Sequence, residues 1–291
     1  MREKSGSWPL FKHRLKLGRW RMRRWVTELR WGKEELAKSP TVLGNAMPKS
    51  GSHLIIQVLQ GLTHLGPFVN PGFPPVNRTE DNRKLPAEAV LANIRAMRPG
   101  DIGYGYLHAR QPFIEALTRP GKAMVFVYRD PRDMIVSHVF YATEMHRGHG
   151  MHRYYTEVLR TMEERISAAI EGVDEEWVKL SNIKEKYEHY LGWLQIPEVF
   201  SLRFEDLILD RENALVSLLN YLEQRGFSPK MTQELSVLAL KEAIAPSRSG
   251  TFRKGKPGNW QEYFTPANKS LFKDLAENLL IQLGYEKDNE W

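Results

Sequence analysis

The sequence predicts an α/β fold in which a P-loop-like parallel sheet is flanked by helices on both faces of a single domain. Apolar strand-like runs alternate with helical segments along the chain, a pattern typical of a parallel sheet covered on both sides. The first of these runs leads through a turn rich in serine and glycine into a helix. With 291 residues, of which 42% are hydrophobic, the chain is long enough to bury a large core.

The net charge of +7 is concentrated at the start of the chain. Residues 1–40 contain 12 Lys or Arg and 4 Asp or Glu, whereas the other 251 residues contain 30 and 31. A nucleic-acid-binding protein is expected to carry its basic surface on the body, so we predict no nucleic-acid partner. We divide the chain into a basic amphipathic arm, residues 1–40, and an α/β domain, residues 41–291.

Apolar residues recur in the arm at helical spacing, with arginines between them: Phe11, Leu15, Met22, Trp25, Val26 and Leu29. Two interpretations of this helix stay open. Either it packs its tryptophans on the domain and leaves its arginines in solvent, or residues 8–31 contact an anionic membrane surface or another polyanion.

The chain has no run of about 18 apolar residues that could span a membrane. No apolar segment of a secretory signal follows the basic start, and there are no cysteines to form disulfides. These features predict a cytoplasmic location, with peripheral membrane contact under the second interpretation of the arm.

Four apolar runs predict the strands of the sheet, at residues 41–47, 101–108, 122–130 and 199–207. Helices are predicted at 52–66, from Pro131 onward, and near 153–171, 182–195, 211–225, 230–244 and 267–283. The long segment 67–88 is rich in proline and asparagine and predicts a loop of the kind that usually serves function.

The stretch MPKSGSH, residues 47–53, joins the first strand to the first helix of the domain. Gly51 allows an anion to approach the backbone, and the amides from Ser50 to His53 open the helix, where its dipole favours negative charge. Lys49 and the hydroxyls of Ser50 and Ser52 add further donors. An ordinary N-capped helix is the alternative interpretation of this stretch.

A second group of anion-binding side chains follows the third strand. Arg129 stands at the strand end, and Ser137 lies eight residues later, two turns into a helix. An arginine and a hydroxyl on one element can hold a second phosphate. Alternatively, Arg129 forms a structural ion pair with Asp130 or Asp133. The stretch TFRKGKPGNWQEYFT, residues 251–265, offers a third basic site, or a turn exposed to solvent.

In this order, the three stretches resemble the motifs of the PAPS-dependent sulfotransferases, especially the soluble, small-molecule type; PAPS is adenosine 3′-phosphate 5′-phosphosulfate. The resemblance covers residues 41–266 and excludes the arm. PKSG resembles the 5′-phosphosulfate loop, YRDPRDMIVS the 3′-phosphate motif, RKGKPGNWQEYFT a C-terminal 3′-phosphate motif, and FEDL a strand end near the adenine. The resemblance implies these PAPS-binding residues: Lys49, Ser50, Gly51, Ser52, His53, Leu54, Arg129, Ser137, Phe204, Arg253, Lys254 and Gly255.

The resemblance further implies transfer of a sulfuryl group from PAPS to a hydroxyl or amine of a small-molecule or lipid-like acceptor, with release of adenosine 3′,5′-bisphosphate (PAP). His108 matches the position of the family's general base, and Lys49 would stabilise the leaving phosphate. No metal is implied. Loops at residues 67–85 and 143–153 are expected to form the acceptor pocket, and the second loop carries His146, His149 and His152, for which a metal site is an alternative.

The sequence departs from the family pattern at three positions. Around Leu240 it is aliphatic where a phenylalanine on a later helix usually completes the stack on the adenine. Leu54 stands where a tryptophan is common, which leaves open what stacks on the adenine, and Tyr106 replaces a lysine close to the catalytic histidine. Two rival functions are a P-loop kinase that uses ATP and a non-catalytic protein that binds a polyanion or membrane through the arm. The kinase predicts a lysine after the last glycine of the loop, whereas Lys49 precedes Gly51.

Overall fold

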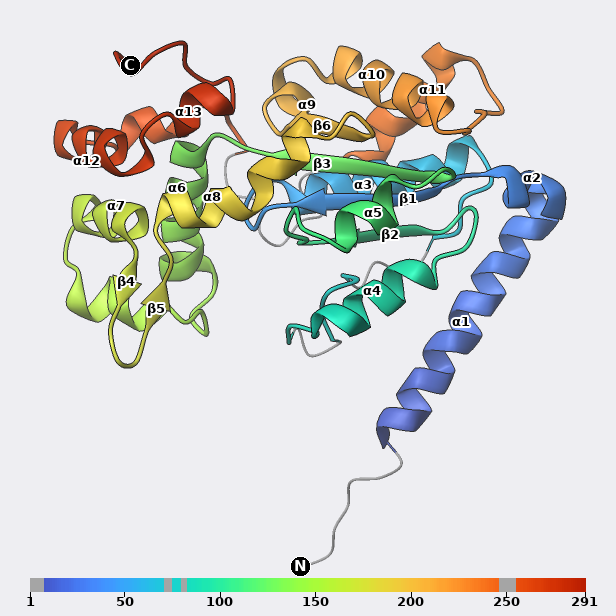
Figure 1. Ribbon diagram of the computed structural model, residues 1–291, viewed down its shortest axis with the longest axis horizontal. Helices are drawn as coiled ribbons and strands as arrows, with labels where there is room; N and C mark the ends of the chain where they lie inside the picture. Colours follow the sequence, from blue (N-terminus) through green and yellow to red (C-terminus); the bar gives the residue numbers. More distant parts are fainter. Residues whose placement is uncertain (1–7, 71–74, 80–82, 246–254) are drawn as a thin grey trace, which may run out of the picture.

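A four-stranded parallel sheet forms the centre of the protein (Figure 1). The computed structural model describes residues 8–70, 75–79, 83–245 and 255–291, with side chains from residue 18 onward. The sheet has the order β2-β1-β3-β6, and its strands are β1 (Thr41–Ala46), β2 (Ile102–Gly105), β3 (Lys122–Tyr128) and β6 (Val199–Arg203).

Helices cover both faces of this sheet, because successive side chains of its central strands point to opposite sides. Leu43, Met124 and Phe126 pack into one core with α4 (Ala87–Arg95), α5 (Phe113–Thr118), α6 (Pro131–Phe140), α7 (Met162–Glu171), α8 (Ile183–Leu191), α12 (Pro266–Ala276) and α13 (Leu279–Gln282). Val42 and Val125 pack into a second core with α3 (Ser52–Leu65), α9 (Asp206–Leu209), α10 (Arg211–Gln224) and α11 (Gln233–Ala243). The predicted α/β fold is confirmed.

The second strand ends earlier than predicted, at Gly105 instead of His108. After Gly105 the chain leaves the backbone ladder and bonds to a side chain of β1. The Asn45 amide donates to the carbonyl of Leu107 at 3.0 Å and accepts from the amide of Leu107 at 2.7 Å. This buried pair holds the segment that carries His108 beyond the carboxyl edge of the sheet.

Other differences concern elements whose sequence signal is weak. The predicted helix at 153–171 is interrupted at Leu159 and Arg160, because Thr161 caps a new helix, α7, with a capping box that includes Glu164. The short helices α4 and α5 and the hairpin of β4 (Val173–Asp174) and β5 (Lys179–Leu180) were not predicted. Gly66 ends α3 as predicted, although its φ of −178° is extended. Glycine is required there because a Cβ would lie 2.7 Å from the Phe227 ring.

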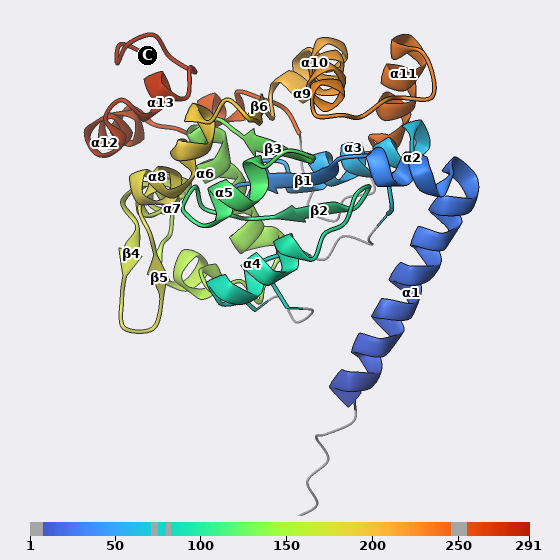
Figure 2. The same ribbon diagram turned by 45° about the vertical axis from the view of Figure 1, so that its right-hand side comes forward.

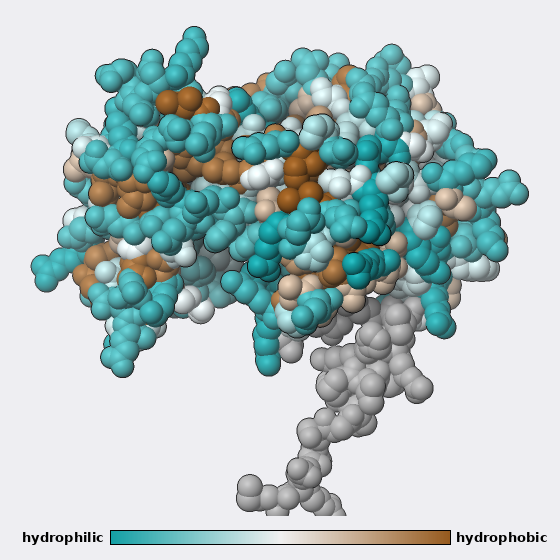
Figure 3. All heavy atoms as spheres, viewed as in Figure 1, coloured by the Kyte–Doolittle hydropathy of each residue, from teal (hydrophilic) through white to brown (hydrophobic). Residues whose placement is uncertain are grey.

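The arm forms the long helix α1 (Trp8–Trp31) and the short helix α2 (Lys33–Lys38), joined at Gly32, whose φ is +91°. Leu36 of α2 is buried, whereas α1 points away from the domain in both ribbon views (Figures 1 and 2). Among the described residues, no helix is long and apolar enough to cross a membrane. On the face shown in Figure 3, hydrophilic side chains predominate and hydrophobic ones form separate patches.

Candidate active site

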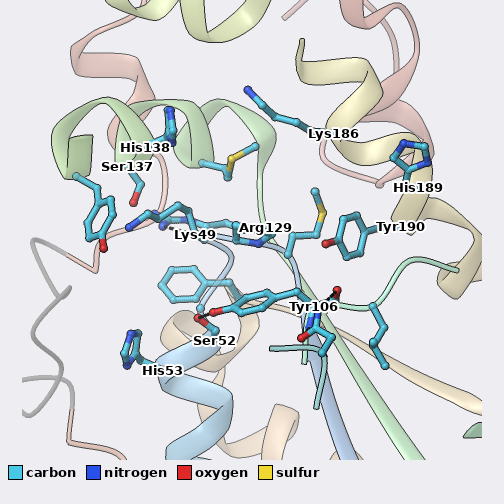
Figure 4. A pocket seen from close by; sticks show the side chains of 18 of the residues that line it. Lys49, Ser52, His53, Tyr106, Arg129, Ser137, His138, Lys186, His189 and Tyr190 are labelled. Atoms are coloured by element: carbon cyan, nitrogen blue, oxygen red, sulfur yellow. Dashed lines mark hydrogen bonds between the residues drawn. The ribbon is translucent and has the colours of Figure 1, made fainter. Parts of the chain in front are cut away.

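A cavity of about 1020 Å³ lies beyond the carboxyl ends of β1 and β3, the usual ligand position in open parallel sheets. Its walls come from the loop after β1, the start of α3, the segment after β2, α6, α8 and the chain near Gly255. Figure 4 shows Lys49, Arg129 and Tyr106 at its centre, with Ser52 and His53 on one side and His138 and Lys186 on the other.

The loop between β1 and α3 presents an open helix end to this cavity. Lys49 and Gly51 both have positive φ, +70° and +94°, and this tight turn aims the start of α3 at the cavity. Within the described part of the chain, no acceptor takes the backbone amides of Gly51, Ser52 and His53. Such an end is suited to bind an anion.

Ser50 is placed differently from the prediction. Its side chain is fully buried and does not line the cavity, and its amide donates to the carbonyl of Met47 at 3.1 Å. The reason is the tight turn at Lys49, which directs Ser50 into the protein. Ser52, His53 and Leu54 do line the cavity.

Gly51 is required for two independent reasons. Its φ of +94° is a conformation that residues with a side chain rarely adopt, and a Cβ there would stand 2.5 Å from Cδ2 of Phe204. Phe204, which follows β6, therefore packs directly on the loop and lines the cavity beside it.

Lys49 places its ammonium group over the Tyr141 ring, 2.7 Å from the ring centroid. No carboxylate of the described residues forms an ion pair with it, and burial lowers its pKa to about 7. An anion that enters the cavity would therefore stabilise the protonated form of Lys49.

Arg129 lies between the loop and α6. Its guanidinium stacks on Phe204 at 4.4 Å, donates to the carbonyl of Lys49 at 3.4 Å and lies 3.8 Å from Oδ2 of Asp133. The predicted ion-pair alternative is thus partly correct. However, Nε of Arg129 is buried and has no partner among the described residues, so the side chain retains a donor for a ligand.

Asp133 has a structural role in the site. The sequence predicted it only as a possible ion-pair partner of Arg129. Its carboxylate accepts from the amides of Gly258 at 2.8 Å and Trp260 at 2.9 Å. It thereby holds the C-terminal segment against α6, where Ser137, Gly255 and Lys256 line the cavity. The predicted residues Arg253 and Lys254 lie outside the described residues.

His108 lines the same cavity as Lys49. Its ring stacks on His189 at 4.7 Å and meets Tyr190 edge-on at 5.0 Å. Burial, and then the positive charge of His189, Arg110 and nearby Lys84, lowers the pKa of His108 to about 4. The imidazole is therefore neutral at pH 7 and can accept a proton.

Tyr106 takes the place where the family pattern has a lysine. Its hydroxyl donates to Oγ of Ser52 at 3.2 Å and accepts from the hydroxyl of Tyr104, also at 3.2 Å. These two hydrogen bonds connect β2 with the anion-binding loop, and Tyr106 contributes no second cation.

Several further cavity residues were missed, among them the titratable residues Lys186, His189 and His138. Lys186 donates to the carbonyl of Ala169 at 3.3 Å, and burial lowers its pKa to about 8. The spacing of Lys186, His189 and Tyr190 on a predicted helix was an available signal that they share one face. No group of three His, Asp or Glu side chains in the described ranges is arranged to hold a metal ion.

The chain is similar to known proteins in sequence and in fold. The family model of the sulfotransferase domain matches residues 109–284, more than half of the chain. Curated relatives include a 3-alpha-hydroxysteroid sulfotransferase of Cavia porcellus, 25% identical over 181 residues, and a flavonol 3-sulfotransferase of Flaveria bidentis, 26% identical over 188 residues. These alignments cover 56% and 55% of both partners, so the chain spans about half the length of these relatives.

Two solved structures have the same fold. A mouse sulfotransferase complexed with PAP matches with a TM-score of 0.57 at 15% identity, over 88% of this chain and 93% of its own. Retinol dehydratase in complex with androsterone and inactive cofactor PAP matches with a TM-score of 0.52 at 14% identity, over 84% and 83%. The predicted resemblance is confirmed by the family match, and the chain belongs to the sulfotransferase family.

Proposed function

We propose that this protein transfers a sulfuryl group from PAPS to a hydroxyl or amine of a small-molecule or lipid-like acceptor. The observation that carries the proposal is that one cavity is lined by an open helix end, Lys49, Arg129 and His108. The names of the curated relatives and the PAP in the two similar structures support the same chemistry.

The described residues fit an adenosine with two anionic groups. The amides of Gly51, Ser52 and His53, together with Lys49, would hold the 5′-phosphosulfate. Arg129, with its unpartnered buried Nε, and Ser137 would hold the 3′-phosphate, joined by Gly255. Arg253 and Lys254, which lie outside the described residues, are proposed for the same phosphate on the sequence motif alone. We expect Phe204 beside the adenine and Leu54 to contribute only apolar contact.

In the proposed reaction the acceptor oxygen or nitrogen attacks the sulfur atom. The bond from sulfur to the phosphate oxygen breaks, the new bond to the acceptor forms, and PAP leaves. Neutral His108 takes the proton of the acceptor as general base. Protonated Lys49 neutralises the charge that develops on the leaving phosphate oxygen, as cations do in phosphoryl transfer.

The acceptor would enter from the side of the loops that follow α3 and α6. Residues of both predicted loops, among them Arg78, Lys84 and His149, line the cavity. Among the described residues that line the cavity, Asp133 and Glu185 are the only acidic ones, and basic residues outnumber them. This charge balance favours an acceptor that carries a negative or strongly polar group.

Calorimetric titration tests the donor site. We expect PAP to bind, adenosine 5′-monophosphate to bind more weakly, and Arg129→Ala to abolish the preference for PAP. Arg153→Ala is the matched control. Arg153 is an exposed arginine that does not line the cavity, and it forms an ion pair with Glu157 at 2.8 Å. A preference for ATP with Mg²⁺ would support a kinase, and no nucleotide binding would support a non-catalytic protein; either result would refute the proposal.

A further inference from the structure

The exposed face of α1 is an apolar stripe that none of the described residues covers. Met22, Trp25, Val26 and Leu29 are 60%, 55%, 51% and 66% exposed. Their spacing of i, i+3, i+4 and i+7 places them on one side of the helix. The other exposed large hydrophobic residues of the described chain are scattered over several elements, so this is a distinct surface.

The opposite side of α1 is attached to the domain. Thr27 is buried, Arg98 lies 4.1 Å from the Trp20 ring centroid, and Arg24 forms an ion pair with Asp101 at 3.1 Å. At 100° per residue, Trp20 and Thr27 point away from the stripe. The contacts therefore fix the rotation of the helix with the stripe outward, and the interpretation that all tryptophans of the arm pack on the domain is wrong for Trp25.

Arginines border the stripe on both sides. Arg19, Arg23 and Arg30 follow one edge, Arg21 follows the other, and all four are exposed. The one acidic residue of this part of the helix, Glu28, lies seven residues after Arg21 on the same border, and its charge is paired with Arg24 at 3.5 Å. An apolar face between basic borders is typical of helices that lie in a membrane interface.

We propose that α1 binds the surface of an anionic phospholipid bilayer and inserts Met22, Trp25, Val26 and Leu29 among the lipids. Charge complementarity favours this occupant, because a second copy of the helix would bring its own arginines against these arginines. Tryptophan is well suited to the boundary, since it has an apolar body and a polar N–H. The proposal does not depend on the sulfotransferase reaction, because none of the described side chains of α1 lines the cavity.

The test is flotation of the full-length protein with vesicles of phosphatidylcholine alone or with about a third phosphatidylserine. We expect binding to the anionic vesicles, a blue shift of tryptophan fluorescence, and loss of at least about tenfold in partition when Trp25→Ser and Leu29→Ser are combined. The matched control combines Trp177→Ser and Leu238→Ser, two residues that are each 51% exposed on other elements and should not matter.

A second variant, Arg19→Glu with Arg30→Glu, changes only exposed side chains and should weaken binding to anionic vesicles and make the remaining binding less sensitive to salt. PAP titration and thermal melting check that each variant is folded. Absence of binding by the wild type, equal binding to neutral vesicles, or equal loss in the control would overturn the proposal. A dimer in sedimentation velocity that the Trp25/Leu29 variant abolishes would instead identify a second copy as the occupant.

Discussion

Lys49 and His108 are the two cavity side chains whose charge state the proposed reaction depends on. Burial acts on both, and it favours the neutral form of each because water solvates a charged group better than the protein interior does. For His108 the neutral form is the one that a base requires. For Lys49 the charged form is required, so the enzyme would rely on the negative charge of its donor to keep this amine protonated.

A pH profile of kcat/KM for PAPS follows from these two groups, since this parameter reports the free enzyme. The rate should rise with pH through about 4, where His108 loses its proton, and fall as pH rises through about 7, where Lys49 loses its own. Lys49→Met should remove the alkaline limb and lower kcat by roughly 10²–10⁴. Retention of the alkaline limb in this variant would contradict the assignment.

His108→Gln should lower kcat by roughly 10²–10⁴ and leave PAP affinity nearly unchanged, because the imidazole acts on the acceptor. His189→Gln is the informative comparison, since the positive charge of His189 lowers the pKa of His108. This variant should retain most activity and shift the acid limb to higher pH. Steady-state rates across pH distinguish the two roles, and equal losses in both variants would argue that the histidine stack is only structural.

At the scale of elements, the loop between β1 and α3 and the segment after β2 position these side chains. The loop depends on Gly51, over which Phe204 packs, and the segment depends on buried Asn45, which bonds to the backbone of Leu107. Both contacts join residues far apart in sequence at the same edge of the sheet.

Gly51→Ala should weaken PAP binding by about tenfold or more, equivalent to about 1.4 kcal/mol, because the added Cβ displaces Phe204. Gly226→Ala is the matched control. Its φ of +98° imposes the same backbone strain, but no atom lies within 4 Å of the added Cβ. Calorimetry should show normal PAP binding in the control, with stability reduced by about 1–2 kcal/mol in thermal melts. Equal PAP affinity in both variants would show that Phe204 is not part of the donor site.

Asn45→Ala leaves the buried amide of Leu107 without a partner, whereas the carbonyl of Leu107 still accepts from Nε1 of Trp193 at 2.8 Å. We expect a loss of about 1–3 kcal/mol in the free energy of unfolding and a larger drop in kcat than in PAP affinity, since His108 is the next residue. Asn93→Ala removes an exposed bond to the carbonyl of Val76 at 2.9 Å and serves as control. Denaturant unfolding and PAP titration measure both effects; unchanged stability would refute the role given to Asn45.

At the scale of the whole molecule, the cavity is formed by segments from Met47 to Asn259, so its ligand holds together parts that the sequence separates. PAP that binds only the folded protein stabilises it by about 2.7 kcal/mol at a concentration of 100 Kd. For a chain of this size this should raise Tm by roughly 5–8 °C. Differential scanning calorimetry should show the shift in the wild type and not in Arg129→Ala.

The sequence by itself determined the fold class, the family and the motif residues Lys49, Gly51 and Arg129, because strand alternation and the turn after each strand are local patterns. The cavity lining differs from the predicted set at Ser50, since only the folded turn decides which of the two serines, Ser50 or Ser52, lines the cavity. The spacing of Lys186 and His189 shows that they share a helix face, but it does not show which site that face meets. Lys186, His138 and Asp133 join the site because α6, α8 and the C-terminal segment come together around one cavity, which no local pattern encodes. The outward rotation of α1 was likewise decided by tertiary contacts. A helix with apolar residues on more than one side can pack against a domain through any of those sides. The ion pair of Arg24 with Asp101 and the contact of Trp20 with Arg98 selected the side that faces the domain.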